Sequence, residues 1–212
     1  MPVKAAIVPV TPFQQNCTLL WDDASMRGAV VDPGGDLDRI EAGIKKTGMS
    51  VEKILLTHGH IDHAGAAAEL KEKLGGIPIE GPHTADKFLL DGLAEQAKAF
   101  GVRGVRSVTP DRWLAEGDSV EVPGASFAVL HCPGHSPGSV VLVNAAQRFA
   151  LVGDVLFAGS IGRTDFPYGD HAALIDAIKT KLIPLGDDIA FICGHGPTST
   201  IGQERRSNPF LQ

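Results

Sequence analysis

Four potential metal ligands lie within six consecutive residues of this chain: His58, His60, Asp62 and His63. Neutral imidazole and carboxylate are the ligands that zinc and similar divalent ions prefer in proteins. An apolar run at 51–56 precedes these residues and is typical of a buried strand, and a helix-forming stretch at 64–70 follows them. The pattern predicts a metal site on a loop at the rim of a sheet.

Three later residues repeat the same local arrangement, in which a ligand-type side chain follows an apolar strand and a glycine. They are His135 after Phe127–Leu130, Asp154 after Phe149–Val152, and His195 after Ile189–Cys193. Glycine allows the backbone to turn sharply and an ion to approach it closely. We therefore expect these residues to join the first four.

Seven candidates are more than one metal ion needs, because a catalytic zinc ion takes three protein ligands and a water molecule. The number suits two ions, each with three ligands, that share one bridging carboxylate and lie about 3.5–4 Å apart. The spacing of His58 and His60 places both on one ion, while Asp62 and His63 turn to the other. Zinc is the expected metal, although iron and manganese accept the same ligands.

Apolar runs and helical periodicity predict the elements that position these ligands. Strands are expected at 5–8, 18–21, 29–31, 51–56, 77–79, 127–130, 139–143, 149–152 and 189–193. Helices are expected at 37–47, 64–74, 84–90, 94–100 and 171–181, the first with Asp36 as its N-cap and the last ended by Pro184.

The order of these elements favours two sheets over one doubly wound sheet, because helices between 64 and 100 separate two groups of strands. Residues 101–125 resemble a linker in composition, but this stretch is short for a domain boundary. We expect one α/β domain over residues 1–212.

Composition narrows the class of protein. The chain is 43% hydrophobic and 21% charged, as in a soluble globular protein, and its net charge of -6 argues against a nucleic-acid partner. Pro9 and Pro12 interrupt the early apolar stretch, and residues 133–138 break the uncharged run 124–147. We therefore expect no secretory signal and no membrane span. Three widely spaced cysteines fit free thiols in the cytoplasm.

The pattern H-x-H-x-D-H with separate later His, Asp and His residues resembles the metallo-β-lactamase fold superfamily over essentially the whole chain. The resemblance implies a four-layer αββα sandwich of two mixed sheets with the metals at one edge. It implies that His58, His60 and His135 hold one ion, that Asp62, His63 and His195 hold the other, and that Asp154 bridges them. Asp32, in an Asp-Pro-Gly turn, would orient a ligand histidine or only cap that turn.

Within the superfamily, the chain is most similar to the short, single-domain bacterial type of glyoxalase II-like hydrolases. The segments that carry this similarity are 32–35, 132–138, 162–166 and 208–211. It implies hydrolysis of a small-molecule thioester, S-lactoylglutathione above all, by a metal-bridging hydroxide, with Asp62 as a possible proton acceptor. In glyoxalase II a C-terminal helical extension helps to hold glutathione, whereas 17 residues follow His195 here. The oligomeric state is not predicted.

Several other residues near the expected site have two interpretations. Arg163, Asp165 and Tyr168 would contact substrate, or Arg163 and Asp165 would pair to order their loop. Cys132 is a weak candidate for a thiol that lines the site, and Cys193 is expected to be a small buried apolar residue. His83, His131 and His171 lack the strand-glycine setting. Ser136 lies in a G-x-S-x-G sequence, but Pro137 after it has no N–H for an oxyanion hole.

Alternative functions use the same ligands. A persulfide dioxygenase, which shares the sequence 162–166, would hold one Fe(II) with two histidines and an aspartate. Lactone or β-lactam hydrolysis would use the two-metal centre on another acyl group. A non-enzymatic zinc module is disfavoured, because structural zinc sites are closed and rich in thiolates, and this one has surplus ligands and no cysteine pair.

Overall fold

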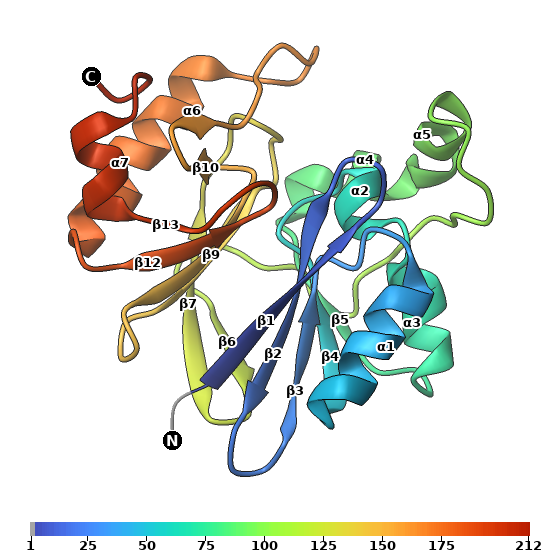
Figure 1. The fold of residues 1–212 in the computed structure, drawn as a ribbon. Coiled ribbons are helices and arrows are strands. Elements are labelled where there is room, and N and C mark those ends of the chain that lie inside the picture. Colours follow the sequence, from blue (N-terminus) through green and yellow to red (C-terminus); the bar gives the residue numbers. More distant parts are fainter. Residues whose placement is uncertain (1–2) are drawn as a thin grey trace.

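A computed structural model describes residues 3–212 and places two β-sheets face to face (Figure 1). The first sheet has five strands in the order β1-β2-β3-β4-β5. β1, β2 and β3 are antiparallel neighbours, and β3, β4 and β5 run parallel. Its strands are β1 Val3–Val10, β2 Gln15–Asp22, β3 Arg27–Val31, β4 Ser50–Leu55 and β5 Ile79–Glu80.

The second sheet has six strands in the order β13-β12-β9-β8-β7-β6, and only its β12–β9 pair is parallel. Its strands are β6 Ser119–Val122, β7 Ala125–His131, β8 Val140–Asn144, β9 Phe149–Gly153, β12 Ala190–Cys193 and β13 Ser199–Thr200. A small two-stranded ribbon is formed by β10 Leu156–Phe157 and β11 Ser160–Ile161.

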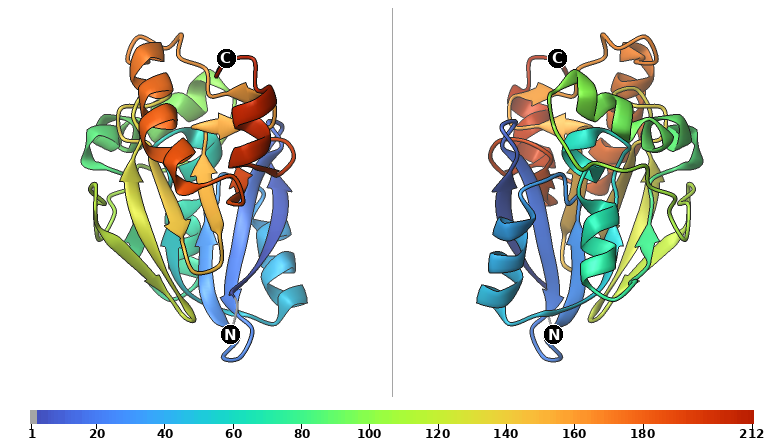
Figure 2. Two further views of the ribbon diagram at one scale, coloured as in Figure 1. Left: turned by 90° about the vertical axis from the view of Figure 1, so that its left-hand side faces the viewer. Right: turned by 90° about the vertical axis from the view of Figure 1, so that its right-hand side faces the viewer.

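Helices cover the outer face of each sheet, so that the molecule has four layers (Figure 2). The first sheet carries α1 Leu37–Thr47, α2 Ile61–Ala64, α3 Ala67–Lys73, the 3₁₀ turn η1 Thr84–Asp86, α4 Lys87–Asp91 and α5 Leu93–Ala99. The second sheet carries α6 His171–Ala177, the π-helical turn η2 Ile178–Leu182, the 3₁₀ turn η3 Ile183–Leu185 and α7 Ile201–Ser207.

Three apolar clusters hold these layers together. One lies between the first sheet and its helices, with Leu19, Ile54 and Leu70 among its members, and a second packs α6, η2 and α7 on the other sheet. The third lies between the sheets and joins Leu20 and Leu55 to residues such as Phe127. The αββα architecture expected from the sequence is confirmed. That residues 1–212 form a single domain stays a prediction, which the shared inter-sheet cluster supports.

Eight of the nine expected strands are present with nearly the expected bounds, and the ninth, expected at 77–79, shares only Ile79 with β5; several helix predictions also need correction. The helix expected at 64–74 is observed as α3 Ala67–Lys73, and a separate single turn, α2 Ile61–Ala64, precedes it, so Asp62 and His63 lie in α2 and not on a loop. Asp36 has a left-handed backbone and does not cap α1 with its side chain; its carboxylate accepts the Thr11 N–H instead. The linker-like stretch 101–125 contains β6, and β13 and α7 were not expected. No helix within residues 3–212 is long and apolar enough to span a bilayer.

Candidate metal centre

The seven candidate ligands come together at one edge of the sandwich, where several strands end (Figure 1). β4 leads into the segment that carries His58 and His60, and α2 follows with Asp62 and His63 in its single turn. Asp154 directly follows β9, His195 lies two residues after the end of β12, and His135 lies four residues after the end of β7. The local pattern of strand, glycine and ligand therefore becomes one cluster because these strand ends share an edge. We call these seven side chains the metal-ligand cluster.

Three histidine nitrogens converge on one side of this cluster. His60 Nδ1 lies 3.0 Å from His58 Nε2 and 3.0 Å from His135 Nε2. Nitrogens bound about 2.0–2.1 Å from one tetrahedral zinc ion would lie about 3.3 Å apart. The spacing is thus close to that of three ligands on a single ion.

A second group lies on the other side and is completed by carboxylates. Asp62 Oδ2 lies 3.2 Å from His195 Nε2 and 3.9 Å from His63 Nε2. Asp154 lies between the groups: its Oδ1 is 3.3 Å from His63 Nε2, and its Oδ2 is 3.5 Å from the Nε2 atoms of His135 and His195. This carboxylate has the position that a bridging ligand requires.

The outer nitrogen of each histidine has its own partner, which orients the ring. His63 Nδ1 donates to Asp32 Oδ2 at 2.9 Å, His135 Nδ1 to the Arg163 carbonyl at 2.8 Å, and His195 Nδ1 to the Phe13 carbonyl at 3.1 Å. His58 Nδ1 is 3.2 Å from Thr57 Oγ1, and His60 Nε2 is 2.8 Å from the Tyr168 hydroxyl. Carbonyl and carboxylate oxygens only accept, so they assign the proton to the outer nitrogen and leave the inner lone pair free for a metal.

Burial favours the neutral form of two of the rings, His58 and His60, as metal binding requires. Burial and the neighbouring histidines lower the pKa of His58 well below its usual value, and burial together with His135 lowers the pKa of His60 to about 3. For Asp154, burial alone would raise the pKa, but His63 more than offsets it and keeps the carboxyl ionised. Burial would lower the pKa of His63, yet Asp154 and Asp62 raise it well above its usual value. Before a metal binds, the cluster therefore combines two neutral rings, His58 and His60, with a His63 ring that the buried carboxylates favour in its charged form.

The hydrogen bonds of the buried side chains give a second, independent indication that these residues bind metal ions. Among the described residues, only three buried side-chain polar atoms lack a partner, and two of them are His63 Nε2 and Asp154 Oδ1. Buried polar atoms without partners are rare, and each one calls for an explanation. A divalent cation between these two atoms would satisfy both of them.

Glycine is required next to one ligand for a steric reason. A Cβ on Gly194 would lie 1.9 Å from Asp154 Oδ1 and 2.6 Å from His63 Cε1. The glycine before His195 thus makes room for the other ligands, rather than supplying an unusual turn as its sequence setting suggested. Asn16 ties the same loop to the first sheet, because its N–H donates to the Gly194 carbonyl at 2.7 Å.

Asp86 is a structural element of the site that the sequence did not reveal. Its carboxylate is fully buried and accepts the N–H of Gly59 at 2.8 Å, the N–H of Gly138 at 2.6 Å and the Ser136 hydroxyl at 2.7 Å. It therefore joins the segment that carries His58 and His60 to the one that carries His135. A Cβ on Gly138 would lie 2.6 Å from the Asp86 backbone nitrogen, so this glycine was the available signal.

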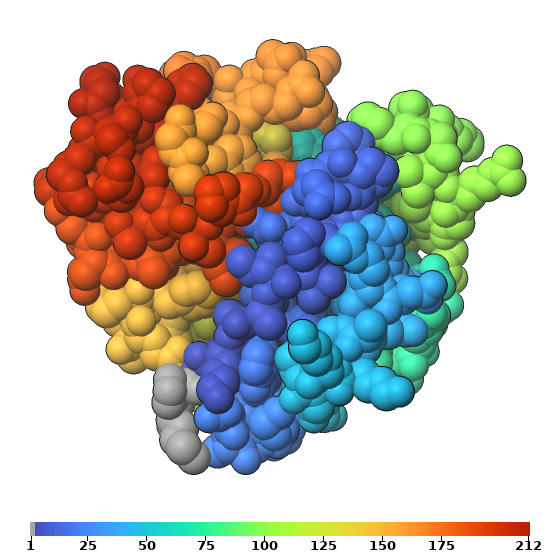
Figure 3. Space-filling model, in the orientation of Figure 1, coloured from blue at the N-terminus to red at the C-terminus, as the bar shows by residue number. Residues whose placement is uncertain are grey.

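A cavity of about 660 Å³ opens over the metal-ligand cluster. The space-filling view shows a hollow there, between the β1–β2 turn and the segment around residues 155–170 (Figure 3). Arg163 and Tyr168 line this cavity, and Asp165 does not. Arg163 pairs with Asp165 through two hydrogen bonds of 2.6 and 2.7 Å, as expected for an ordered loop.

The remaining sequence candidates lie outside the cavity lining. Cys132 is buried in the apolar cluster beneath α6, and burial raises its pKa to about 12, so the prediction that it lines the site was wrong. Ser136 bonds to Asp86 and Ser139 and is buried, which leaves it no nucleophilic role. His83 and His131 stack on each other with ring centroids 4.0 Å apart, and Cys193 is buried as expected.

Comparison with known proteins agrees with this architecture. Residues 10–195 match the metallo-beta-lactamase superfamily, and the chain belongs to that superfamily. It is 50% identical over 206 residues to the hydroxyacylglutathione hydrolase GloC of Haemophilus influenzae, an alignment that covers 97% of this chain and 96% of that protein. The chain thus has the sequence of a glyoxalase II-like metallo-hydrolase.

Two solved structures are similar over nearly their whole length. The B3 metallo-beta-lactamase BLEG-1 is 36% identical with a TM-score of 0.89, and the match covers 98% of this chain and 99% of that one. The protein TTHA1623, solved in a di-iron-bound form, is 38% identical with a TM-score of 0.87, and the match covers 97% and 100%.

Proposed function

We propose that this protein is a dinuclear metal-dependent hydrolase that cleaves thioesters of the hydroxyacylglutathione type, with S-lactoylglutathione as the first substrate to test. One observation carries the proposal: seven ligand atoms converge at the floor of a cavity in a chain that is 50% identical to a hydroxyacylglutathione hydrolase. A cytoplasmic location is part of the proposal and is supported by three free cysteines.

In this proposal His58, His60 and His135 hold one ion, Asp62, His63 and His195 hold the other, and Asp154 bridges them. Two ions bound in this way would lower the pKa of water and polarise the thioester carbonyl. The role of Asp32 is to hold His63 in its ligand orientation, which its 2.9 Å contact with Nδ1 supports.

The chain's own residues supply a proton acceptor for the reaction. Asp62 lies at the cavity floor beside His195, and His63 lowers its pKa although burial opposes this, so its carboxylate is ionised and able to accept a proton. The leaving group is a thiol with an ordinary pKa of about 8.5, which departs as thiolate without a strong general acid. The proposed reaction therefore needs no general acid to protonate the leaving group.

Zinc is the metal we propose, because histidine and aspartate suit it. The relative TTHA1623 was solved with two irons, so iron is the alternative for the same ligands. A second candidate activity is β-lactam hydrolysis, favoured by the 36% identity to the beta-lactamase BLEG-1 over 98% of this chain.

The test uses protein with a measured metal content and a panel of S-lactoylglutathione, a simple lactone and a β-lactam. We expect two metal ions per chain and hydrolysis of the thioester well above that of the other two, with loss of turnover after chelation. Oxygen uptake with glutathione persulfide, and one iron per chain, would instead indicate a dioxygenase. Turnover confined to the lactone or the β-lactam would overturn the choice of substrate.

A further inference from the structure

The walls of the cavity differ in chemistry from its floor. Ile61 and Leu89 line it beside Phe13, Phe100 and Phe166, together with Tyr168. We call Phe13, Phe100, Phe166 and Tyr168 the aromatic wall. These rings stand above the metal-ligand cluster, where the part of a substrate beyond the scissile bond would lie.

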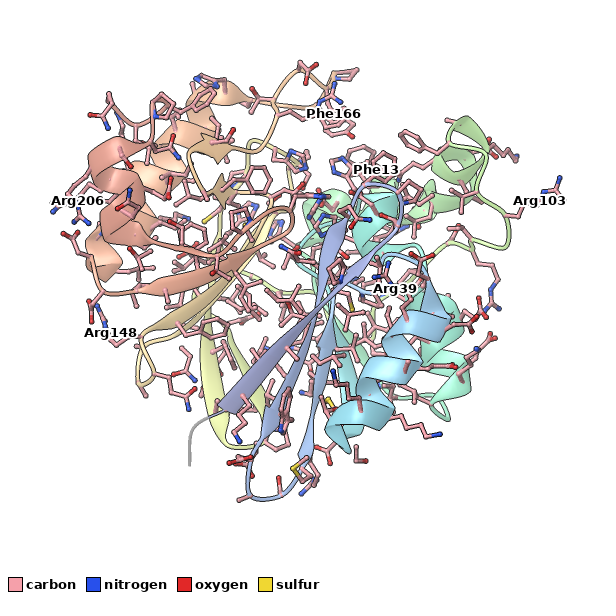
Figure 4. The ribbon with its side chains drawn as sticks, viewed as in Figure 1. Phe13, Arg39, Arg103, Arg148, Phe166 and Arg206 are labelled. Atoms are coloured by element: carbon pink, nitrogen blue, oxygen red, sulfur yellow. The ribbon has the colours of Figure 1, made fainter. Side chains whose placement is uncertain are left out.

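The aromatic wall has two sides that come from opposite halves of the fold. Phe13 follows β1, and its ring packs edge-on against Phe100 at the end of α5, with centroids 5.3 Å apart. Phe166 stacks on Tyr168 with centroids 5.3 Å apart, and its ring lies 5.0 Å from that of His60. Figure 4 shows Phe13 and Phe166 on opposite halves at the same end of the molecule.

Two of these rings are unusually accessible for large apolar side chains. Phe13 is 44% exposed and Phe100 is 57% exposed. Apolar side chains that gather at a cavity mouth and remain open to solvent mark a binding site, because a ligand that covers them removes apolar area from water.

The cavity offers little to bind a charged ligand. Among the described residues that line it, Arg163 is the only lysine or arginine. Its guanidinium is already paired with Asp165 and lies 4.5 Å above the Phe166 ring. Glutathione carries two carboxylates, and this lining offers them one cation that already has a partner. The recognition of glutathione's charges therefore does not explain why the cavity is lined in this way.

From these observations we infer that the site selects thioesters whose acyl group carries an aryl or other bulky apolar substituent, which packs between Phe100 and Phe166. The inference rests on the proposed thioesterase function and deepens it by naming the substrate class. A cavity of about 660 Å³ has room for such a group, whereas a lactoyl group would leave the aromatic wall uncovered.

The first experiment compares S-mandeloylglutathione with S-lactoylglutathione on metal-loaded protein. The two share the thiol, the α-hydroxyl group and the net charge, and differ only in a phenyl in place of a methyl group. We expect kcat/KM to be higher for the mandeloyl thioester by on the order of tenfold, in keeping with what an apolar pocket discriminates. Phe100→Ala should reduce this ratio several-fold, and Phe210→Ala, an exposed phenylalanine that does not line the cavity, should leave it unchanged.

The second experiment measures binding without turnover, by calorimetry of the metal-loaded protein with S-benzylglutathione and S-methylglutathione, which are thioethers. We expect the benzyl compound to bind about tenfold more tightly, with a smaller difference in Phe100→Ala. Equal affinities, or a Phe100→Ala variant that matches Phe210→Ala, would overturn the inference. A benzyl preference without any thioester hydrolysis would refute the proposed function and, with it, the assignment of thioesters as the ligands, and would leave only the preference of the aromatic wall for bulky apolar groups.

Discussion

The floor and the wall of the cavity are built on different principles. Every histidine of the metal-ligand cluster has its outer nitrogen held by a carbonyl, a carboxylate or a hydroxyl, and His58 and His63 are wholly buried. Phe13 and Phe100 in the aromatic wall are about half exposed and touch each other edge-on. The difference indicates that the chemistry depends on buried polar contacts, while selectivity depends on exposed rings that can change at little cost in stability.

The largest effect on the metal-ligand cluster at the cavity floor is expected from Asp154→Asn, which keeps the shape of the side chain and removes the charge between the two ligand groups. We expect a loss of kcat beyond the roughly 10–100-fold that follows removal of an outer partner of a metal ligand. Metal content should fall below two ions per chain. Steady-state kinetics and metal analysis of the purified protein measure both effects.

The control for this change is Asp188→Asn, which removes an exposed carboxylate that pairs with Arg148 far from the cavity. It should leave metal content and kcat unchanged, since an exposed pair contributes little. Two bound ions and normal turnover in Asp154→Asn would show that this carboxylate does not bridge.

A smaller effect is expected from Asp86→Ala, which leaves the floor's ligands intact and removes the carboxylate that joins their segments. Three donors, from Gly59, Ser136 and Gly138, lose a buried acceptor. At about 1–3 kcal/mol for each unsatisfied buried group, we expect the free energy of unfolding to fall by at least about 3 kcal/mol. Metal affinity should fall by about 10–100-fold, as for other outer contacts.

Urea denaturation of the metal-free protein and competition with a chelator separate these two effects. Asp91→Ala is the matched control, because this carboxylate lies five residues away and makes only an exposed pair with Lys87. Asp86→Asn retains one acceptor oxygen and should lie between the two. Unchanged chelator competition in Asp86→Ala would limit Asp86 to a role in stability.

The same contrast explains which parts of the site the sequence predicted. Each ligand could be found from a local signal: the dense H-x-H-x-D-H run marks the first four, and an apolar strand followed by glycine and a ligand-type residue marks His135, Asp154 and His195. Asp86 has no such signal, since its partners Gly59 and Gly138 lie 27 and 52 residues away. Phe13 holds His195 through its carbonyl oxygen, which no side-chain pattern reveals. Asp36 failed as an N-cap because the Thr11 N–H, 25 residues away, takes its carboxylate.

The smallest effect is expected at Tyr168, which belongs to both regions. Its hydroxyl lies 2.8 Å from His60 Nε2, while its ring stacks on Phe166 and meets Phe88 edge-on. Burial and the charge of Asp86 raise the pKa of its phenol to about 12, so the hydroxyl is protonated at neutral pH. With His60 Nδ1 facing the other ligands, Nε2 carries the proton and donates it to the Tyr168 oxygen.

Two substitutions at this residue separate floor from wall. Tyr168→Phe removes one hydrogen bond of about 0.5–1.5 kcal/mol, so kcat/KM should fall by about 2–10-fold for every substrate alike. The ratio between mandeloyl and lactoyl thioesters should stay constant, because the ring remains. Tyr168→Ala should lower that ratio as well, since stacking on Phe166 is lost. If Tyr168→Phe instead changed the ratio between mandeloyl and lactoyl thioesters and left lactoyl turnover intact, the hydroxyl would act on the substrate rather than on His60. Tyr168 would then belong to the aromatic wall alone.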